Sequence, residues 1–459
     1  MRILLFLSMF FSPQVIHASD TMPGLQVSAD GRYFQTSDGK PFFWLGDTGW
    51  LLFSKCSRSD VRKYLDTRKR QGFNVIQVMV IHELTSKNTY GDSALVHRDV
   101  SRPLTTTGAD TTDAVAYDFW DHVDFVISEA GKRGIYMALV PVWGSNVKDG
   151  KVSSPQARAF AYFLARRYAD LRHIIWLNGG DIRGEDGREV WMTIGTTIRE
   201  QGSRQLMTFH PRGRTSSADW FHQEAWLDFN MFQSGHKTYA QDTSRTEKKH
   251  YGEDNWRYVV ADRALKPARP VLDGEPSYEN IPHGLHDSLQ TRWAASDLRR
   301  YAYWSVFAGA AGFTYGENAV MQFNHMGDIG ANFGVESDWE QTLDAPGTTG
   351  MMHLKHLMLG RSFFDRIPAQ EIIADNDVER YDRILATRGA SYALAYTCNG
   401  RIFKVDMDKL PFRPARAFWF DPKSGKRKSI LAFNRKGIVA FDPPGIKADG
   451  NDHVLILEI

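Results

Sequence analysis

Short apolar runs alternate with longer amphipathic stretches from residue 42 onward. Several runs are continuously apolar, which is typical of strands covered on both faces in a parallel sheet. The expected strands are Phe42–Leu45, Asn74–Val80, Ile135–Val142, His173–Leu177, Gln205–His210, Phe229–Gln233, Pro270–Gly274 and Gly312–Tyr315. The expected helices between them are Ser59–Gln71, Phe119–Arg133, Pro155–Tyr168, Arg188–Gln201 and Ser288–Phe307. This alternation predicts an α/β fold, a (β/α)8 TIM barrel with insertions.

A doubly wound open sheet is the alternative fold. It would need a glycine-rich phosphate loop after the first strand, but Gly46-Asp47-Thr48-Gly49-Trp50 stands there instead. Before the first strand, turn signals at Ala29-Asp30-Gly31 and Ser37-Asp38-Gly39 predict a hairpin over residues 25–40. The barrel domain, including this N-terminal hairpin, is therefore expected over residues 19–369.

The pattern changes near residue 370, where helical periodicity ends and short runs are separated by turns. Asp421-Pro422-Lys423-Ser424-Gly425 is a strong turn signal. We expect a small antiparallel all-β sandwich over residues 370–459. Its expected strands are Arg383–Thr387, Tyr392–Thr397, Arg401–Val405, Ala417–Asp421, Ile438–Phe441 and His453–Ile459.

The first 18 residues are typical of a secretory signal peptide. Arg2 precedes an apolar stretch over Ile3–Phe11, and Ile16-His17-Ala18 ends on a small residue. A buried N-terminal helix is the alternative. No later window has enough uninterrupted apolar residues to cross a bilayer. We therefore expect a secreted or periplasmic protein that is not inserted in a membrane.

Composition limits the possible partners. The formal net charge of +2 gives no electrostatic reason to bind nucleic acid. Cys56 and Cys398 are the only cysteines, so a disulfide framework is excluded, while one bridge stays open. Export without disulfides fits a bacterial protein. The 13 Trp, 17 Tyr and 28 Phe suit a sugar-binding cleft, whose flat aromatic faces pack on sugar rings, but also suit ordinary cores. We expect a monomer without a cofactor.

In a TIM barrel, reactive side chains lie where strands end, on the βα loops. The expected strand ends provide a polar rim rich in carboxylates and amides, with aromatic side chains among them. Its members, expected to bind substrate, are Asp47, Trp50, Gln77, Glu83, Trp143, Asn178, His210, Gln233, His236, Tyr315 and Glu317.

Asp181 and Glu275 stand out from this rim. Each follows an apolar strand and lies beside glycine, which lets the backbone turn sharply. Hydrolysis of a glycosidic bond needs two carboxyl groups across the scissile bond. The fourth and seventh strands face each other across a barrel mouth, so the two side chains can meet there. The alternative is that either carboxylate is a helix cap or part of a loop ion pair.

Other chemistries have less support. Asp273 shares strand parity with Glu275 and should point into the barrel. His82-Glu83 lacks the second histidine of a zinc protease motif, and no Gly-x-Ser-x-Gly nucleophile elbow occurs. His210 and His236 could hold a metal in principle, but histidines in such places more often hydrogen-bond substrate. We therefore expect no metal.

The sequence also resembles the apiosidase-like glycoside hydrolases of family 140 from about Gly31 to the C-terminus. The residues that carry the resemblance are Phe43-Trp44-Leu45-Gly46-Asp47-Thr48, Gly72-Phe73-Asn74-Val75-Ile76-Gln77, Ile174-Ile175-Trp176-Leu177-Asn178-Gly179-Gly180-Asp181, Gly274-Glu275-Pro276-x-Tyr278-Glu279, Tyr303-Trp304-Ser305 and Gly312-Phe313-Thr314-Tyr315-Gly316.

This resemblance implies a barrel followed by a β-sandwich, with Asp181 as acid/base and Glu275 as nucleophile. It also implies release of terminal apiose from rhamnogalacturonan II side chains of pectin by a retaining mechanism. Asn178 departs from the aliphatic residue expected there. Related sequences carry a collagen-binding label for the second domain, for which residues 370–459 give no argument.

Two other functions stay open at this point. One is a catalytically silent carbohydrate- or matrix-binding protein on a glycosidase-like barrel. The other is a glycosidase of different sugar specificity. The binding protein would have no need for paired acids at facing strand ends, so Asp181 and Glu275 favour hydrolysis of an oligosaccharide or polysaccharide.

Overall fold

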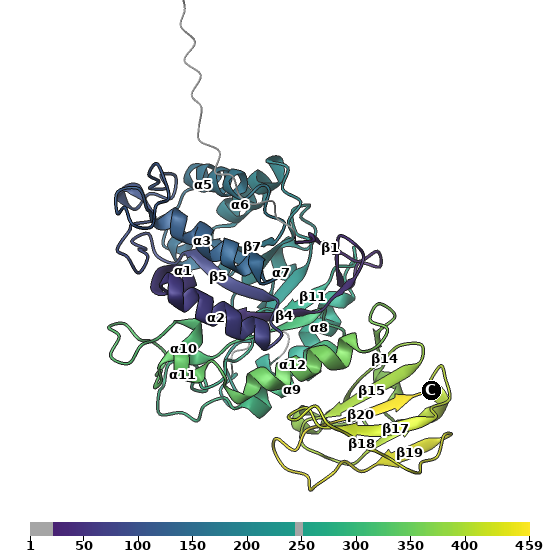
Figure 1. Cartoon of the computed structure of the whole chain (residues 1–459). Helices are drawn as coiled ribbons and strands as arrows, with labels where there is room; N and C mark the ends of the chain where they lie inside the picture. The colour runs from purple at the N-terminus through teal and green to yellow at the C-terminus, as the bar shows by residue number, and fades with distance from the viewer. Residues whose placement is uncertain (1–21, 244–250) are drawn as a thin grey trace, which may run out of the picture.

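A computed structural model describes residues 22–243 and 251–459, and a barrel occupies the larger part of it (Figure 1). Its parallel strands are β4 (Trp44–Thr48), β5 (Val75–Ile81), β6 (Tyr136–Val142), β7 (Ile174–Ile182), β8 (Met207–Pro211), β10 (Asn230–Gln233), β11 (Val271–Asp273) and β12 (Gly312–Tyr315). Each falls on an expected apolar run, so the TIM barrel is confirmed.

The barrel closes between β8 and β10. β8 and β9 (Thr215–Ser216) end the hydrogen-bonded strand order, and β9 pairs with β10 in the antiparallel direction. Across the remaining gap, Asp228 N–H donates to the Met207 carbonyl at 2.8 Å, and Thr208 Oγ1 donates to the Phe229 carbonyl at 2.5 Å. These two hydrogen bonds hold β8 and β10 side by side and so close the barrel.

Helices cover the outside of the barrel. The expected helices correspond to α2 (Arg58–Arg70), α3 (Phe119–Lys132), α5 (Ser154–Arg167), α6 (Arg188–Glu200) and α9 (Ala295–Phe307). Ser57 begins α2 with a capping box to Asp60, whereas α9 starts seven residues later than the expected Ser288. The pattern had not indicated α1 (Leu52–Lys55), α4 (Gly144–Lys148), α7 (Ala218–Phe221), α8 (Asn255–Arg263), α10 (Asn318–Met321), α11 (Trp339–Thr342) and α12 (Pro346–Leu359).

A small N-terminal sheet covers the end of the barrel where the strands begin. The expected hairpin is present as β1 (Leu25–Val27) and β2 (Phe34–Thr36), and β3 (Pro41–Phe42) adds a third antiparallel strand. The ring of Phe34 is buried 5.9 Å from Trp44 and 5.1 Å from Phe229, at the starts of two barrel strands. The opposite end of the barrel is left for the site.

The C-terminal part is all β and antiparallel, as expected. One sheet has the order β13-β14-β15-β20-β17-β18, and β16 pairs with β19 in a second sheet. Asp421–Gly425 forms the turn between β17 and β18, where Gly425 has a φ of 68°. The strands are β13 (Ile367–Pro368), β14 (Leu385–Arg388), β15 (Tyr392–Thr397), β16 (Phe403–Asp406), β17 (Arg416–Phe420), β18 (Arg427–Ser429), β19 (Ile438–Phe441) and β20 (His453–Glu458).

The sandwich packs on the barrel through α9 (Figure 1). Arg299 on α9 donates two hydrogen bonds, of 2.7 and 2.8 Å, to the carboxylate of Asp452, and both side chains are buried. The rings of Tyr303 and Tyr396 stack at 4.6 Å beside this pair. Burial of a charge is tolerated only with such pairing, so the two domains meet at a specific, buried ion pair.

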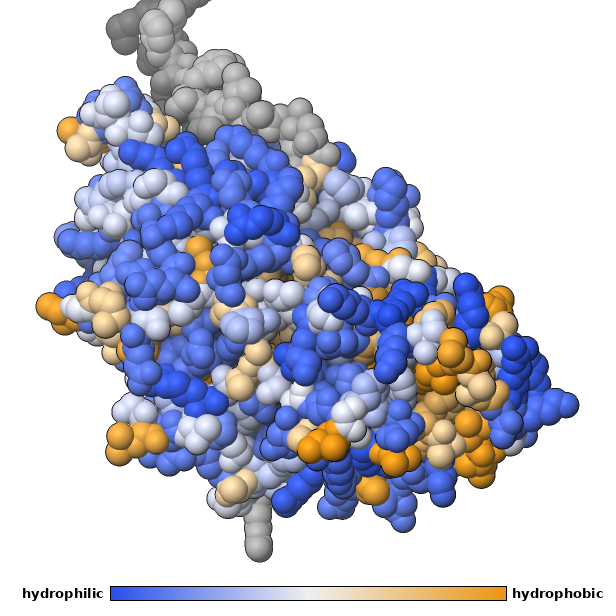
Figure 2. All heavy atoms as spheres, turned by 60° about the horizontal axis from the view of Figure 1, so that its bottom comes forward, coloured by the Kyte–Doolittle hydropathy of each residue, from blue (hydrophilic) through white to orange (hydrophobic). Residues whose placement is uncertain are grey.

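The face shown in Figure 2 is mostly hydrophilic, and apolar surface gathers on it over the C-terminal domain. Cys56 and Cys398 are free and buried, so they form no bridge. The expected signal peptide, residues 1–18, lies outside the described residues. No helix among those that are described is long and apolar enough to cross a membrane.

Candidate active site

A bulge in β7 presents Asp181. Gly179 and Gly180 have φ values of 93° and 113°, and Asp181 itself has a φ of 46°. The pairing of β7 with β8 shifts register between Gly179 and Ile182. A Cβ on Gly180 would lie 2.5 Å from the Trp143 ring, so only glycine fits there. Such a bulge re-aims a side chain, and Asp181 is solvent-exposed while its neighbours in the strand are buried.

Glu275 follows β11 and lies against two imidazoles. His236 Nε2 is hydrogen-bonded to Glu275 Oε1 at 3.2 Å. His210 Nε2 lies 3.1 Å from Oε2, although its N–H is not directed at that oxygen. The Asp181 backbone N–H donates to His210 Nδ1 at 3.3 Å, so this nitrogen is the acceptor and Nε2 is the one near Glu275. One imidazole therefore bridges the backbone of Asp181 and the carboxylate of Glu275.

The two carboxyl groups are shifted in opposite directions. Solvent reaches Asp181, but the surrounding protein removes much of its hydration, and this together with the nearby Glu275 carboxylate raises the pKa of Asp181 to about 6. Burial by itself would raise the pKa of Glu275, but the two imidazoles outweigh burial and hold that pKa below its usual value. One group is thus protonated under conditions in which the other is ionised.

Other predicted rim residues contact the backbone before Glu275 and the side chains around it. Gln77 Nε2 donates to the Gly274 carbonyl at 2.9 Å, immediately before the glutamate. Trp50 lies 5.4 Å from the His210 ring and 5.3 Å from Trp143. Trp50 Nε1 donates to the Tyr278 hydroxyl at 3.2 Å. Tyr278 was not among the predicted site residues, although its position three residues after Glu275 was a usable signal.

Asp273 points into the barrel, in keeping with its strand parity. The side chain is completely buried and accepts hydrogen bonds from Ser234 Oγ at 2.8 Å and Asn255 Nδ2 at 3.1 Å. Burial raises the pKa of Asp273 to about 7. This carboxyl group lies beneath the site and has no exposed surface for substrate.

Four residues expected to bind substrate are buried and engaged elsewhere, so we assign them structural roles. Asp47 pairs with Arg68 and accepts a hydrogen bond from the Tyr64 hydroxyl, each at 2.6 Å. Glu317 caps α10 by accepting from two backbone N–H groups, at 2.8 and 2.9 Å. Asn178 donates to the Trp191 carbonyl and the Tyr315 hydroxyl to Glu279. In each case the strand or loop turns the side chain into the protein.

The other predicted rim residues differ in exposure. Glu83 is exposed after β5, Trp143 is half-buried beside Gly180, and Gln233 is buried at the end of β10. The side-chain oxygen of Gln233 and Nδ1 of His236 are both buried without a hydrogen-bond partner. In residues 22–243 and 251–459, no three His, Cys, Asp or Glu side chains gather as a metal site requires.

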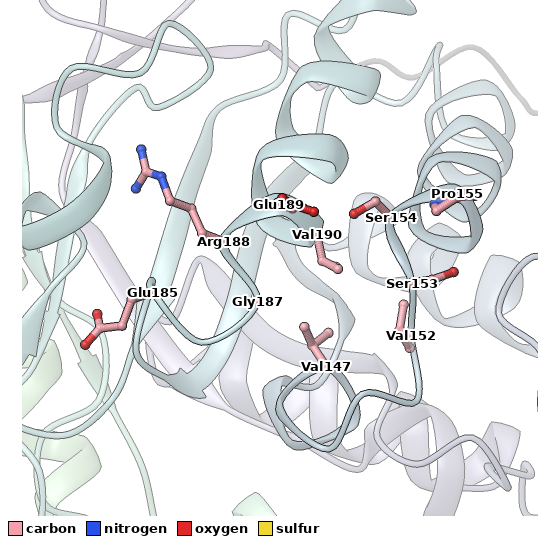
Figure 3. A pocket seen from close by; sticks show the side chains of 10 residues that line it. All are labelled: Val147, Val152, Ser153, Ser154, Pro155, Glu185, Gly187, Arg188, Glu189 and Val190. Carbon is pink, nitrogen blue, oxygen red and sulfur yellow. The ribbon is translucent and has the colours of Figure 1, made fainter.

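An open groove of about 640 Å³ lies between the loop that follows β7 and the start of α5 (Figure 3). Glu185 and Gly187 in its wall belong to the loop that follows β7, and Ser153 and Pro155 belong to the start of α5. None of the predicted site residues lines it. The groove therefore shares a loop with Asp181 but is separate from the two carboxyl groups.

Both domains are similar to known families. A family model described as "Apiosidase-like, catalytic domain" matches residues 28–365, and one described as "Putative collagen-binding domain of a collagenase" matches residues 367–458. A solved structure described as a glycoside hydrolase is 43% identical, with a TM-score of 0.89 over 96% of this chain and 98% of that chain.

A second structure, described as a glycoside hydrolase family 5 protein from Bacteroides vulgatus ATCC 8482, is 44% identical. Its TM-score is also 0.89, over 95% of this chain and 94% of that chain. No curated protein matches the chain.

Proposed function

The chain belongs to the apiosidase-like glycoside hydrolases, and from that premise we propose that Asp181 is its acid/base and Glu275 its nucleophile. The observation that carries this assignment is the opposite displacement of the two pKa values, raised for Asp181 and lowered for Glu275. A carboxyl pair whose environments separate its pKa values is typical of an acid and a nucleophile working together. The shared contact with His210 supports their nearness.

The proposed reaction proceeds in two steps. Glu275 attacks the anomeric carbon while Asp181 protonates the leaving oxygen, and a covalent glycosyl–enzyme forms. Loss of the Glu275 charge then lowers the pKa of Asp181, because a neighbouring negative charge had helped to raise it. Asp181 can next deprotonate the water that releases the sugar, which regenerates both groups.

We expect retention of the anomeric configuration. An NMR time course of the first-formed sugar tests this, because retention gives the anomer of the substrate and inversion gives the opposite one. Inversion would leave Asp181 as the acid but would make Glu275 the base that activates water.

The proposed substrate is a terminal apiose on rhamnogalacturonan II-type pectic glycans. The description of the matching family supports the sugar. The expected signal peptide supports the location, because cell-wall glycans are met only by an exported enzyme. A glycosidase acting on another terminal sugar would share the site, so a panel of pectic side-chain oligosaccharides should be tested for released sugar.

The assignment is tested with Asp181→Asn and Glu275→Gln, and with Glu340→Gln on α11 as a control away from the site. General acid–base assistance contributes about 10²–10⁴-fold, and loss of the nucleophile should cost at least as much. We expect turnover to fall accordingly with unchanged thermal midpoints, while the control keeps wild-type turnover. Near-wild-type turnover in either site variant would refute the role of that residue.

A further inference from the structure

The loop that carries His236 is held at its far end by the C-terminal domain. Its described part, residues 234–243, follows β10 and lies against η2 (Gly252–Asp254), which precedes α8. The Tyr239 backbone N–H, three residues after His236, donates to Glu253 Oε1 at 2.6 Å, and the Tyr239 hydroxyl donates to Asp254 at 2.7 Å. Both carboxylates are buried. The position of Tyr239 therefore depends on where Glu253 is fixed.

The second carboxylate oxygen of Glu253 receives its aligned hydrogen bond from the other domain. Its Oε2 accepts from the hydroxyl of Tyr381 at 2.8 Å, and Tyr381 belongs to η4 (Arg380–Asp382) of the sandwich. Arg300 Nη1 on α9 also lies 2.8 Å from Oε2, but it makes no hydrogen bond of acceptable geometry there. Arg300 neutralises Glu253, and the Tyr381 hydroxyl fixes its orientation.

Aromatic and cationic contacts strengthen the same attachment. The rings of Tyr239 and Tyr381 lie edge to face at 5.5 Å. The guanidinium of Arg380 lies 4.9 Å from the Tyr239 ring centre, and that of Arg383 lies 4.1 Å from the Trp256 ring centre on α8. A guanidinium over an aromatic face is attracted by the ring, more strongly when the contact is desolvated. The segment 380–383 therefore contacts both Tyr239 and the start of α8.

At its other end the loop is hydrogen-bonded to Glu275. His236 makes the well-aligned hydrogen bond to the carboxylate, and the Gly235 N–H donates to the Glu275 carbonyl at 3.1 Å. Only two residues separate His236 from Tyr239, so a shift of Tyr239 must be absorbed close to the imidazole. Displacement of a catalytic group by about 1 Å can slow a reaction by about 10²-fold.

We propose that Tyr381 of the C-terminal domain is a positioning residue for catalysis: it orients Glu253, which fixes Tyr239 and thereby keeps His236 on Glu275. The sandwich then contributes to turnover without touching substrate. This inference rests on the proposed role of Glu275 as nucleophile.

The test compares two variants, each of which lacks a different tyrosine hydroxyl of the C-terminal domain. Tyr381→Phe removes the bond to Glu253, and Tyr392→Phe removes a bond of 2.9 Å to the Ser362 carbonyl, away from the His236 loop. Turnover, KM and thermal midpoint are measured for both. We expect Tyr381→Phe to lower kcat by about 2- to 30-fold with little change in KM, the range seen for residues that act through others. Tyr392→Phe should change only the thermal midpoint.

The pH dependence of kcat/KM distinguishes a role of Tyr381 in positioning His236 from a general loosening of the contact between the two domains. The titratable and charged groups that face Glu275 are His210, His236, Asp181, Asp273 and the Tyr278 hydroxyl. A donor hydrogen bond favours the ionised carboxylate. Weakening the His236 bond therefore raises the pKa of Glu275, and the acid limb of kcat/KM in Tyr381→Phe should move to higher pH. Tyr392→Phe should keep the wild-type limb.

Glu253→Gln provides a second, independent variant, since its single amide oxygen cannot accept from both the Tyr239 N–H and the Tyr381 hydroxyl. We expect the same loss of kcat, and a double variant no slower than the slower single one. The proposal is overturned if Tyr381→Phe keeps the wild-type kcat and pH profile, or if Tyr392→Phe slows turnover equally. Glu275→Gln tells the two hypotheses apart: full activity in that variant refutes the nucleophile, whereas an inactive Glu275→Gln beside an unaffected Tyr381→Phe refutes only the positioning role.

Discussion

At the residue scale, surroundings give two similar carboxyl groups different chemistry. Glu275 must be ionised to attack, and two imidazoles lower its pKa. Asp181 must be protonated to donate, and desolvation with the charge of Glu275 raises its pKa to about 6. Activity should therefore rise as pH passes the pKa of Glu275 and fall as pH passes about 6. A bell-shaped dependence of kcat/KM on pH is expected, and it reports the free enzyme.

Asp181→Asn checks the assignment of the alkaline limb. The residual activity of this variant should no longer fall near pH 6, because the titrating acid is gone. An alkaline limb that persists would belong to another group, and Asp273 beneath the site, with a pKa of about 7, would be the first to test.

Gly180 is a second residue whose identity the fold dictates. Gly180→Ala would place a Cβ 2.5 Å from the Trp143 ring at a φ of 113°. We expect a shifted bulge, a displaced Asp181 and a loss of turnover of about 10²-fold, the effect of a misplacement of 1 Å. Gly202→Ala is the matched control, since Gly202 has a φ of 81° with nothing within 4 Å. It should cost about 1–2 kcal/mol of stability and leave kcat unchanged.

At the scale of elements, the ion pair between Asp47 on β4 and Arg68 on α2 attaches helix to barrel. Both side chains are fully buried. Asp47→Asn would leave the guanidinium without its charge partner, and removal of one partner from a buried pair costs about 3–5 kcal/mol. Denaturant unfolding should show this loss, while the folded protein keeps its kcat because Asp47 has no surface exposed to substrate.

Asp66→Asn on the same helix is the control for that experiment. Asp66 pairs with Arg133 at 2.7 Å but is 62% exposed, so its loss should cost about 0–1 kcal/mol. Equal destabilisation by the two variants would contradict a special role for the buried pair. A large fall in kcat for Asp47→Asn would restore the substrate-binding role first expected for that residue.

At the scale of the whole molecule, the sandwich completes the barrel as a folded body. A chain cut after residue 369 would lack Asp452, the ion-pair partner of Arg299, and would expose the ring of Tyr303. We expect a lower thermal midpoint and a tendency to aggregate, because a buried cation and an apolar face would meet water unpaired. A truncated protein with the wild-type thermal midpoint by circular dichroism would show that the barrel does not need this interface.

The sequence by itself determined the order and position of the main elements. The strands β15 and β19 have the expected ends, and all eight barrel strands fall on apolar runs, because a strand covered on both faces must be apolar throughout. The glycines before Asp181 and Glu275 also marked both carboxyl groups. Short helices such as α4 and α10 gave no signal, since four or five residues are too few to show a helical period.

Only the tertiary structure decided what each polar residue of the rim does. Asp47 and Asp181 look alike in sequence, yet one meets Arg68 from a helix and the other is turned out by a bulge. The partners of Glu275 come from β8 and from the loop after β10, and that loop is held by Tyr381 more than 100 residues away. Side-chain direction and pKa depend on groups that folding brings together, and no local pattern encodes those groups.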